Sequence, residues 1–151
     1  MKTPAETLCL VRGGGDLATG VIFRLHHAGF PIVVTELENP LVVRRTVSAA
    51  NAVFEGSIQV EGMHVQLSGT AEEAVAKSKD GIISVFLSQK LPDIAASVII
   101  DARIAKRNID TQISDAELVI GMGPGFEAGK DCHLVIETKR GNSLGRVIRK
   151  G

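Results

Sequence analysis

The chain has 151 residues, of which 44% are hydrophobic and 23% charged, which is the size and composition of one globular domain. Its 17 basic and 17 acidic residues leave a formal net charge of +0, which excludes the overall basic charge typical of proteins that bind nucleic acid or anionic membranes. The N-terminus is too polar for a signal peptide, and no apolar run approaches the ~20 residues that span a bilayer. Two isolated cysteines without a disulfide pattern favour the cytoplasm.

The N-terminal quarter of the chain predicts a β-α-β unit. A short apolar run over 8–11 is typical of a buried strand, and apolar residues then recur at helical spacing over 17–28. Asp16 is a suitable N-cap for this helix, and Gly29 is a suitable end. A second buried strand follows over 31–35, and such a unit almost always has parallel strands.

The remaining elements are predicted from alternation, short apolar runs and turn residues. We expect a helix over 42–52, a hairpin over 56–67 with its turn at Glu61-Gly62, and a helix over 70–79 opened by a capping box from Thr70 to Glu73. Further strands are expected over 82–87, 97–100, 118–120 and 134–137, and residues 144–148 are expected to return beside the last of them through Arg140-Gly141-Asn142.

This order predicts an α/β fold. We expect a Rossmann-like, mostly parallel sheet flanked by helices, with a small β-hairpin insertion and an antiparallel C-terminal edge. Residues 1–151 form a single domain in this interpretation, and the lack of a closing helix leaves open that they are the N-terminal part of a longer protein. The edge strand near the C-terminus is a place where two copies could pair as a homodimer.

The pattern Gly13-x-Gly15-x-x-Ala18 lies directly after a predicted strand and opens a helix. The first glycine permits a tight turn, the second lets the backbone approach a phosphate, and the third small residue lets helix and sheet pack closely. Free N–H groups and the helix dipole at this point favour an anion. Glu36 follows about 20 residues later, where a ribose-binding acid is expected. The alternatives are a turn that binds nothing and a site for another anion, and the carboxylate of Asp16 counts against a plain dinucleotide site.

Two other loops also follow predicted strands, over 101–108 and over 121–126. The carboxyl ends of parallel strands lie at one edge of a sheet, so we expect all three loops to line one crevice. Arginine side chains suit phosphate oxygens and would give this crevice a positive potential. A solvated helix face and simple turn geometry are the respective alternatives for these two loops. The predicted cofactor-binding residues are Arg12, Gly13, Gly14, Gly15, Asp16, Glu36, Arg44, Arg45, Asp101, Arg103, Lys106, Arg107, Gly121, Gly123 and Gly125.

Metal binding and classical catalysis receive little support from the sequence. The pair His26-His27 lies late in the first predicted helix, where a cation is favourable for structural reasons. Cys132-His133 lacks the second ligand pair of a zinc site. No arrangement of a nucleophile and a base can be assembled, and Asp101 is equally suited to capping a turn. We therefore expect no metal site and a protein that is not a classical enzyme.

These segments resemble a known family. The segments that carry the resemblance are Val11–Gly20, Arg24-Leu25, Ala28–Phe30, Thr35–Leu37, Arg44–Ser48, Asp101–Arg103, Ala105–Asn108, Gly121–Phe126, Val135–Thr138, Arg140-Gly141 and Leu144–Arg146. Together they are similar to the YqeB-type family, which is linked to maturation of selenium-dependent molybdenum hydroxylases. The family is distantly similar to the Rossmann-like part of XdhC-type proteins, which handle molybdenum cofactor.

The resemblance implies a bacterial or archaeal accessory protein whose ligand is a molybdenum cofactor of the molybdopterin type and whose partner is an apo molybdenum hydroxylase. That cofactor carries a phosphate, which the glycine loop and the arginines suit. Two other functions stay open from the residues themselves. One is an NAD-dependent oxidoreductase, favoured by the glycine pattern with Glu36. The other is a non-catalytic interaction module in which the glycine loop serves only packing.

Overall fold

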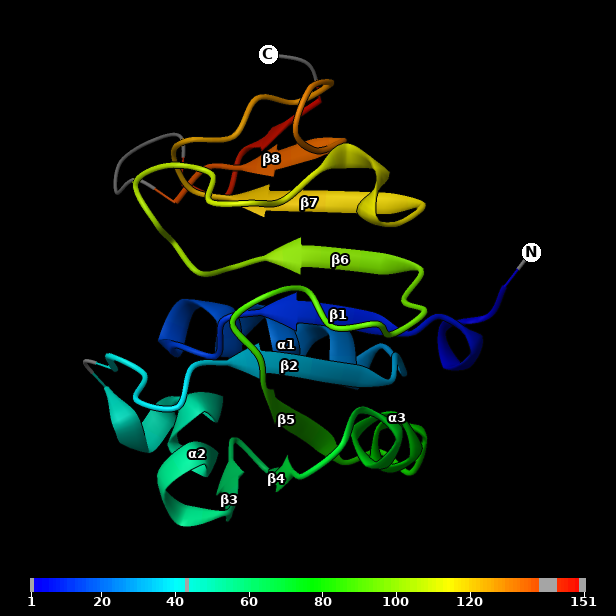
Figure 1. Cartoon of the computed structure of the whole chain (residues 1–151), viewed down its shortest axis with the longest axis vertical. Helices are drawn as coiled ribbons and strands as arrows, with labels where there is room; N and C mark the ends of the chain where they lie inside the picture. Colours follow the sequence, from blue (N-terminus) through cyan, green and yellow to red (C-terminus); the bar gives the residue numbers. More distant parts are fainter. Residues whose placement is uncertain (1, 43, 139–143, 150–151) are drawn as a thin grey trace.

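A computed structural model of the chain describes residues 2–42, 44–138 and 144–149, and these residues form one nine-stranded sheet (Figure 1). The strand order is β3-β4-β5-β2-β1-β6-β7-β8-β9. The strands are β1 (Cys9–Arg12), β2 (Ile32–Glu36), β3 (Ser57–Val60), β4 (Met63–Ser68), β5 (Ile83–Leu87), β6 (Val98–Asp101), β7 (Leu118–Met122), β8 (Leu134–Ile136) and β9 (Val147–Ile148).

The sheet is parallel from β4 through β8, and only the two edge pairs, β3 with β4 and β8 with β9, are antiparallel. In β1 all four residues are buried, because helices and loops cover both faces of the central strands. Arg12 at the end of β1 lies in register with Thr35 of β2 and Asp101 of β6. Polar residues at or next to the carboxyl ends of three neighbouring strands therefore meet at one edge of the sheet.

Three α-helices accompany the strands in the described part of the chain: α1 (Asp16–His27), α2 (Ala52–Glu55) and α3 (Ala71–Lys79). In the view of Figure 1, α1 lies behind the sheet and α3 lies in front of it. The segments 88–97, 102–117 and 123–133 contain no α-helix, only a single 3-10 turn at Ile113–Asp115. The prediction of a sheet flanked by helices therefore holds for the first half of the chain only.

Most predicted strands are confirmed. The hairpin of β3 and β4 turns at Glu61 and Gly62, whose φ angles of 51° and 79° fit the tight turn that the sequence predicts. This hairpin adds to the edge of the main sheet, because β4 pairs with β5. The antiparallel C-terminal edge is also confirmed, since β9 pairs with β8. The predicted turn at 140–142 lies outside the described residues.

The predicted helix over 42–52 is wrong. The described part of this segment forms two 3-10 turns, Arg45–Val47 and Ala49–Asn51, and α2 begins only at Ala52. The reason is tertiary. The amide of Ala50 donates to the carbonyl of Gly14 (2.8 Å) and the amide of Ala49 donates to the Thr19 hydroxyl (2.9 Å). Amides that are used in this way cannot make the bonds of a continuous helix.

The predicted C-terminal end of α1 is confirmed, and its predicted N-cap is wrong. Gly29 ends the helix as predicted, with a φ of 94° and with the Phe30 amide donating back to the Leu25 carbonyl. Asp16 is not the N-cap, because Gly15 occupies that position and Asp16 is the first helical residue. Its Oδ1 accepts from the adjacent amide of Leu17 at 3.0 Å.

The capping of α3 provides a first prediction. The Thr70 hydroxyl accepts from the Glu73 amide at 3.1 Å, and the Glu73 carboxylate accepts from the amide of Gly69. We expect Thr70→Ala to lower the free energy of unfolding by about 1 kcal/mol in urea denaturation, because one amide of the first turn loses its acceptor. Thr70→Ser keeps the hydroxyl and serves as the control. Equal stability of the alanine and serine variants would contradict this role of Thr70.

Candidate functional site

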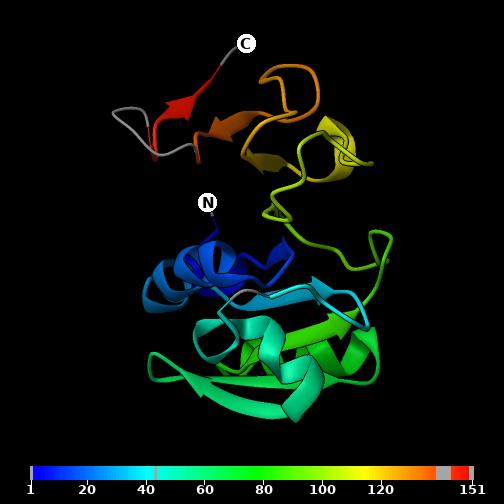
Figure 2. The same cartoon turned by 90° about the vertical axis from the view of Figure 1, so that its left-hand side faces the viewer.

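A cavity of about 820 Å³ lies at the carboxyl ends of β1, β2, β5 and β6. This edge of the sheet faces left in Figure 1 and toward the viewer in Figure 2. The volume falls within the range of roughly 300–1,000 Å³ that is typical of small-molecule sites. Residues 12–18, 35–37, 39–42, 88–90, 102–105 and 109–110 line the cavity.

The three glycines of the loop between β1 and α1 have different roles. Gly13 has a φ of 94°, and a Cβ there would lie 3.0 Å from the carbonyl oxygen of Ala102, so this position requires glycine. A Cβ on Gly14 would lie 3.1 Å from the amide nitrogen of Ala50. A Cβ on Gly15 would meet nothing within 4 Å. The first two glycines therefore serve packing, and the loop is open toward the cavity at Gly15.

The N-terminus of α1 also lies at the cavity. Among the described residues, the amides of Gly15, Asp16 and Ala18 have no hydrogen-bond partner, so they are available to an anion. The carboxylate of Asp16 lies beside them and is 41% exposed, and its Oδ2 lies 3.9 Å from Nε of Arg44. The charge of Asp16 offsets part of the attraction that the helix exerts on an anion.

Glu36 ends β2 and lies against the glycine loop. Its Oε2 accepts from the amide of Gly14 at 2.8 Å, and its Oε1 accepts from the amide of Leu37 at 2.9 Å. The sequence predicts an acid at this position that binds ribose. In the structure this carboxylate accepts a hydrogen bond from the Gly14 amide, a loop amide that was expected to face the ligand. Glu36 also lines the cavity.

The two arginines that line the cavity are held by carboxylates. Arg12 is 2% exposed, and its Nη1 lies 2.9 Å from Oδ1 of Asp110. Arg103 binds the same oxygen at 2.9 Å and also binds Asp101 through two bonds, Nε to Oδ1 (3.0 Å) and Nη2 to Oδ2 (2.6 Å). These four residues form an ion-pair network in which each arginine charge is matched, so the predicted positive potential from Arg12 and Arg103 is largely cancelled.

Thr111 connects this network to the loop after β6. Its hydroxyl donates to Oδ2 of Asp101 (2.7 Å) and accepts from Nη1 of Arg12 (3.0 Å). Burial disfavours the charged form of Asp101, but hydrogen bonds from Arg103 and Thr111 outweigh it and lower the pKa of this carboxyl below its ordinary value. The network fixes a loop in which Ile104 has a φ of 54°, a strained value for a β-branched residue.

Several predicted site residues lie elsewhere. Arg44, Asp101, Lys106 and Arg107 do not line the cavity: Asp101 lies beneath it in the network, and the other three are exposed. The side chain of Arg45 lies outside what the structure describes.

The loop after β7 does not line this cavity, so the structure does not bring Gly121, Gly123 and Gly125 into the crevice that the loops after β1 and β6 form. A Cβ on Gly125 would overlap the backbone of Arg107, and a Cβ on Gly121 would overlap the ring of Phe126. Close packing therefore requires glycine at both positions, against another segment at Gly125 and within the loop itself at Gly121. Asp110 and the aliphatic residues of the cavity wall are not predicted from the sequence, because no known motif marks them.

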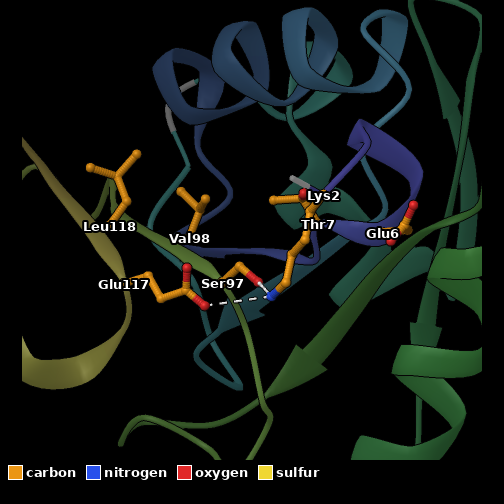
Figure 3. Close-up of a pocket in the computed structure, with 7 residues that line it drawn as sticks. All are labelled: Lys2, Glu6, Thr7, Ser97, Val98, Glu117 and Leu118. Atoms are coloured by element: carbon orange, nitrogen blue, oxygen red, sulfur yellow. Dashed lines mark hydrogen bonds and ion pairs between the residues drawn. The ribbon is translucent and has the colours of Figure 1, made fainter.

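A second hollow of about 570 Å³ lies at the opposite edge of the sheet, near the amino ends of β6 and β7. Nζ of Lys2 lies 2.8 Å from the Ser97 hydroxyl and 3.5 Å from Oε1 of Glu117, and Figure 3 draws both contacts as dashed lines. The Lys2 ammonium thus pairs with the Ser97 hydroxyl and the Glu117 carboxylate at an exposed position. The carboxyl-end cavity, which combines the glycine loop, the start of α1 and Glu36, is therefore the candidate site.

Metal and thiol chemistry find no support in the described residues. They contain no group of three or more histidine, cysteine, aspartate or glutamate side chains that could hold a metal ion. Burial raises the pKa of the Cys9 thiol to about 11, which leaves it un-ionised and a poor nucleophile at neutral pH. The site is suited to binding by backbone amides, carboxylates and apolar side chains.

Comparison with known proteins gives one informative match. The chain is 44% identical over 147 residues to the uncharacterized protein YqeB of Escherichia coli (strain K12), which covers 95% of this chain and 27% of that protein. The chain thus spans about a quarter of the length of the curated relative it matches. This agrees with the resemblance to YqeB-type proteins and gives no activity. No family model and no solved structure match the chain. None of the described helices has the length and apolar character needed to cross a membrane.

Proposed function

We propose that this chain is a Rossmann-like binding module that holds a phosphate-bearing cofactor or nucleotide and acts as an accessory factor in the maturation of selenium-dependent molybdenum hydroxylases in the cytoplasm. The observation that carries the proposal is the position of the cavity. It lies at the carboxyl ends of β1 and β6, between which the strand order reverses. In open α/β sheets this is the point at which ligands bind.

The strand order supports the Rossmann-like part of the proposal. The block β5-β2-β1-β6-β7-β8 reads 3-2-1-4-5-6 when these strands are numbered along the chain, which is the order of dinucleotide-binding folds. The glycine loop after β1 and the acid at the end of β2 occupy the expected places in that order. The segments after β5, β6 and β7 differ, because they contain loops where such folds have helices.

The residues of the cavity fit a phosphorylated pterin. The open amides of Gly15 and Asp16 would hold its phosphate, and the side chains of Leu37 and Leu41 would contact its ring system. When bound, a molybdenum cofactor would supply redox chemistry to an apo molybdenum hydroxylase as the partner. The residues of this chain would bind, orient and release it.

A second candidate is an NAD-dependent oxidoreductase. Glu36 lines the cavity at the position of a ribose-binding acid and would repel the 2′-phosphate of NADP. Titration with NADH distinguishes the two proposals, because a saturable fluorescence change with NADH, together with the absence of a response to a pterin cofactor, favours the oxidoreductase.

The test is a thermal-shift screen with molybdopterin-type cofactor, NAD, NADP, ATP, GTP and inorganic phosphate. A ligand at 100 times its Kd stabilises the folded state by roughly 2.7 kcal/mol, and we expect an increase in Tm of several degrees with the pterin cofactor. Gly15→Asp should abolish the shift, because its carboxylate has space in front of the open amides. Gly20→Asp is the matched control, since Gly20 is exposed on α1 and also has open space around it. No shift with any of these compounds would refute the proposal.

A further inference from the structure

We infer that Glu36 is a specificity-determining residue that restricts the cavity to ligands with a planar ring and one phosphate group, and that it excludes nucleoside triphosphates. This inference rests on the proposed function, since it concerns which phosphate-bearing ligand the same cavity accepts. It comes from three observations: the balance of charges in the cavity, the hydrogen bonds of Glu36, and the exposed aliphatic side chains at the cavity mouth.

The charges around the cavity do not favour a polyanion. Three basic and three acidic residues line it: Arg12, Lys90, Arg103, Asp16, Glu36 and Asp110. Both arginines are paired with carboxylates of the network. Of the three lining cations, Lys90 alone has no ion-pair partner among the described residues. The ammonium group of Lys90 and the N-terminus of α1 together suit a ligand with about two negative charges. One phosphomonoester carries about this charge near neutral pH.

Glu36 occupies the place that a second phosphate would need. Its carboxylate already accepts from the Gly14 amide at 2.8 Å, so the amide next to the open Gly15 is not available. A chain of phosphates that extended along the loop from α1 would approach this carboxylate and be repelled by it. A single phosphate at the amides of Gly15 and Asp16 would avoid this contact. The negative charge of Glu36, rather than its size, is therefore expected to select the ligand.

The mouth of the cavity is apolar. Leu17, Leu37, Leu41 and Ile109 all line it and are 50%, 49%, 102% and 59% exposed. Large aliphatic side chains with this exposure, gathered around one cavity, form a surface that a flat ring can cover. They extend from α1, from the segment after β2 and from the loop after β6. We therefore expect most of the affinity to come from the ring and its contacts, with the phosphate fixing its orientation.

Titration calorimetry of the chain with AMP, ADP and ATP tests the inference, without divalent cations that would mask phosphate charge. We expect affinity to fall with each added phosphate, and ribose 5-phosphate to bind more weakly than AMP. Glu36→Gln keeps an oxygen that can accept from Gly14 and removes the charge. It should raise the affinity for ATP relative to AMP by about tenfold. Glu38→Gln, an exposed change two residues away that does not line the cavity, should leave the ratio unchanged.

The outcomes separate the inference from the proposed function. Binding of AMP and ATP with an unchanged ratio in Glu36→Gln overturns the inference and leaves the proposed function standing. Failure of these nucleotides and of the pterin cofactor to bind overturns both. Salt dependence of the unaltered chain provides a measurement that does not require the variant to fold. Repulsion from Glu36 predicts that added salt raises the affinity for ATP relative to AMP, and a fall in that ratio overturns the inference.

Discussion

Asp101→Asn is expected to lower the free energy of unfolding by about 3–5 kcal/mol, because it removes one partner from a buried ion pair. The Asp101 side chain is 3% exposed and binds Arg103 at two points and Thr111 at a third. An asparagine keeps the size but cannot match the Arg103 charge, which Asp110 then shares with Arg12. The loop after β6, which forms one wall of the cavity, is expected to loosen as well.

Urea denaturation of Asp101→Asn measures this effect, with Asp93→Asn at an exposed position as the control. The pKa of Asp101 is lowered in the folded state, so its contribution to stability is complete above its ordinary value of 3.8. That contribution is lost as the pH falls through the lowered pKa. The gap in stability between the unaltered chain and Asp101→Asn should therefore be constant near neutral pH and shrink below about pH 4. A gap that stays constant down to about pH 2 would show that the ion pair is not its source.

Gly125→Ala is expected to cost more than about 3 kcal/mol of stability, because it combines a positive φ with overlap against the backbone. Gly125 has a φ of 97°, and a Cβ there would overlap the Cα of Arg107. The main chain of Arg107 cannot move aside as the end of a flexible side chain can. The loops after β6 and β7 would therefore have to separate.

Gly81→Ala separates the cost of the positive φ from the cost of the backbone overlap. Gly81 has a similar φ of 84° but open space around its Cβ position, so this variant should cost only about 1 kcal/mol in thermal or urea denaturation. The comparison also tests the role of the Gly-Pro-Gly loop, which the sequence assigns to ligand binding and the structure assigns to packing. If Gly125→Ala were as stable as Gly81→Ala and lost ligand binding, the assignment to packing would be wrong.

The sequence by itself determined the features that depend on neighbours along the chain. The apolar run over 8–11, the helical spacing over 17–28 and the second run over 31–35 predict β1, α1 and β2 to within about two residues. The glycine loop follows from the same local pattern, and so does its position at the carboxyl edge of a parallel sheet. Glu36 could be placed at this edge because its position depends only on the end of one strand.

Only the tertiary structure decided what these residues contact. The segment over 42–52 does not form a helix, because the amide of Ala50 donates to the carbonyl of Gly14, which is far away in sequence. The net charge of the cavity depends on Asp110, whose carboxylate offsets the positive charges of Arg12 and Arg103. Local motifs assign these two arginines to phosphate binding. Glu36 binds the Gly14 amide only because β2 ends beside β1. Periodicity reports which face of an element is buried, whereas hydrogen bonds and ion pairs depend on distances of a few ångströms between segments that the chain brings together only on folding.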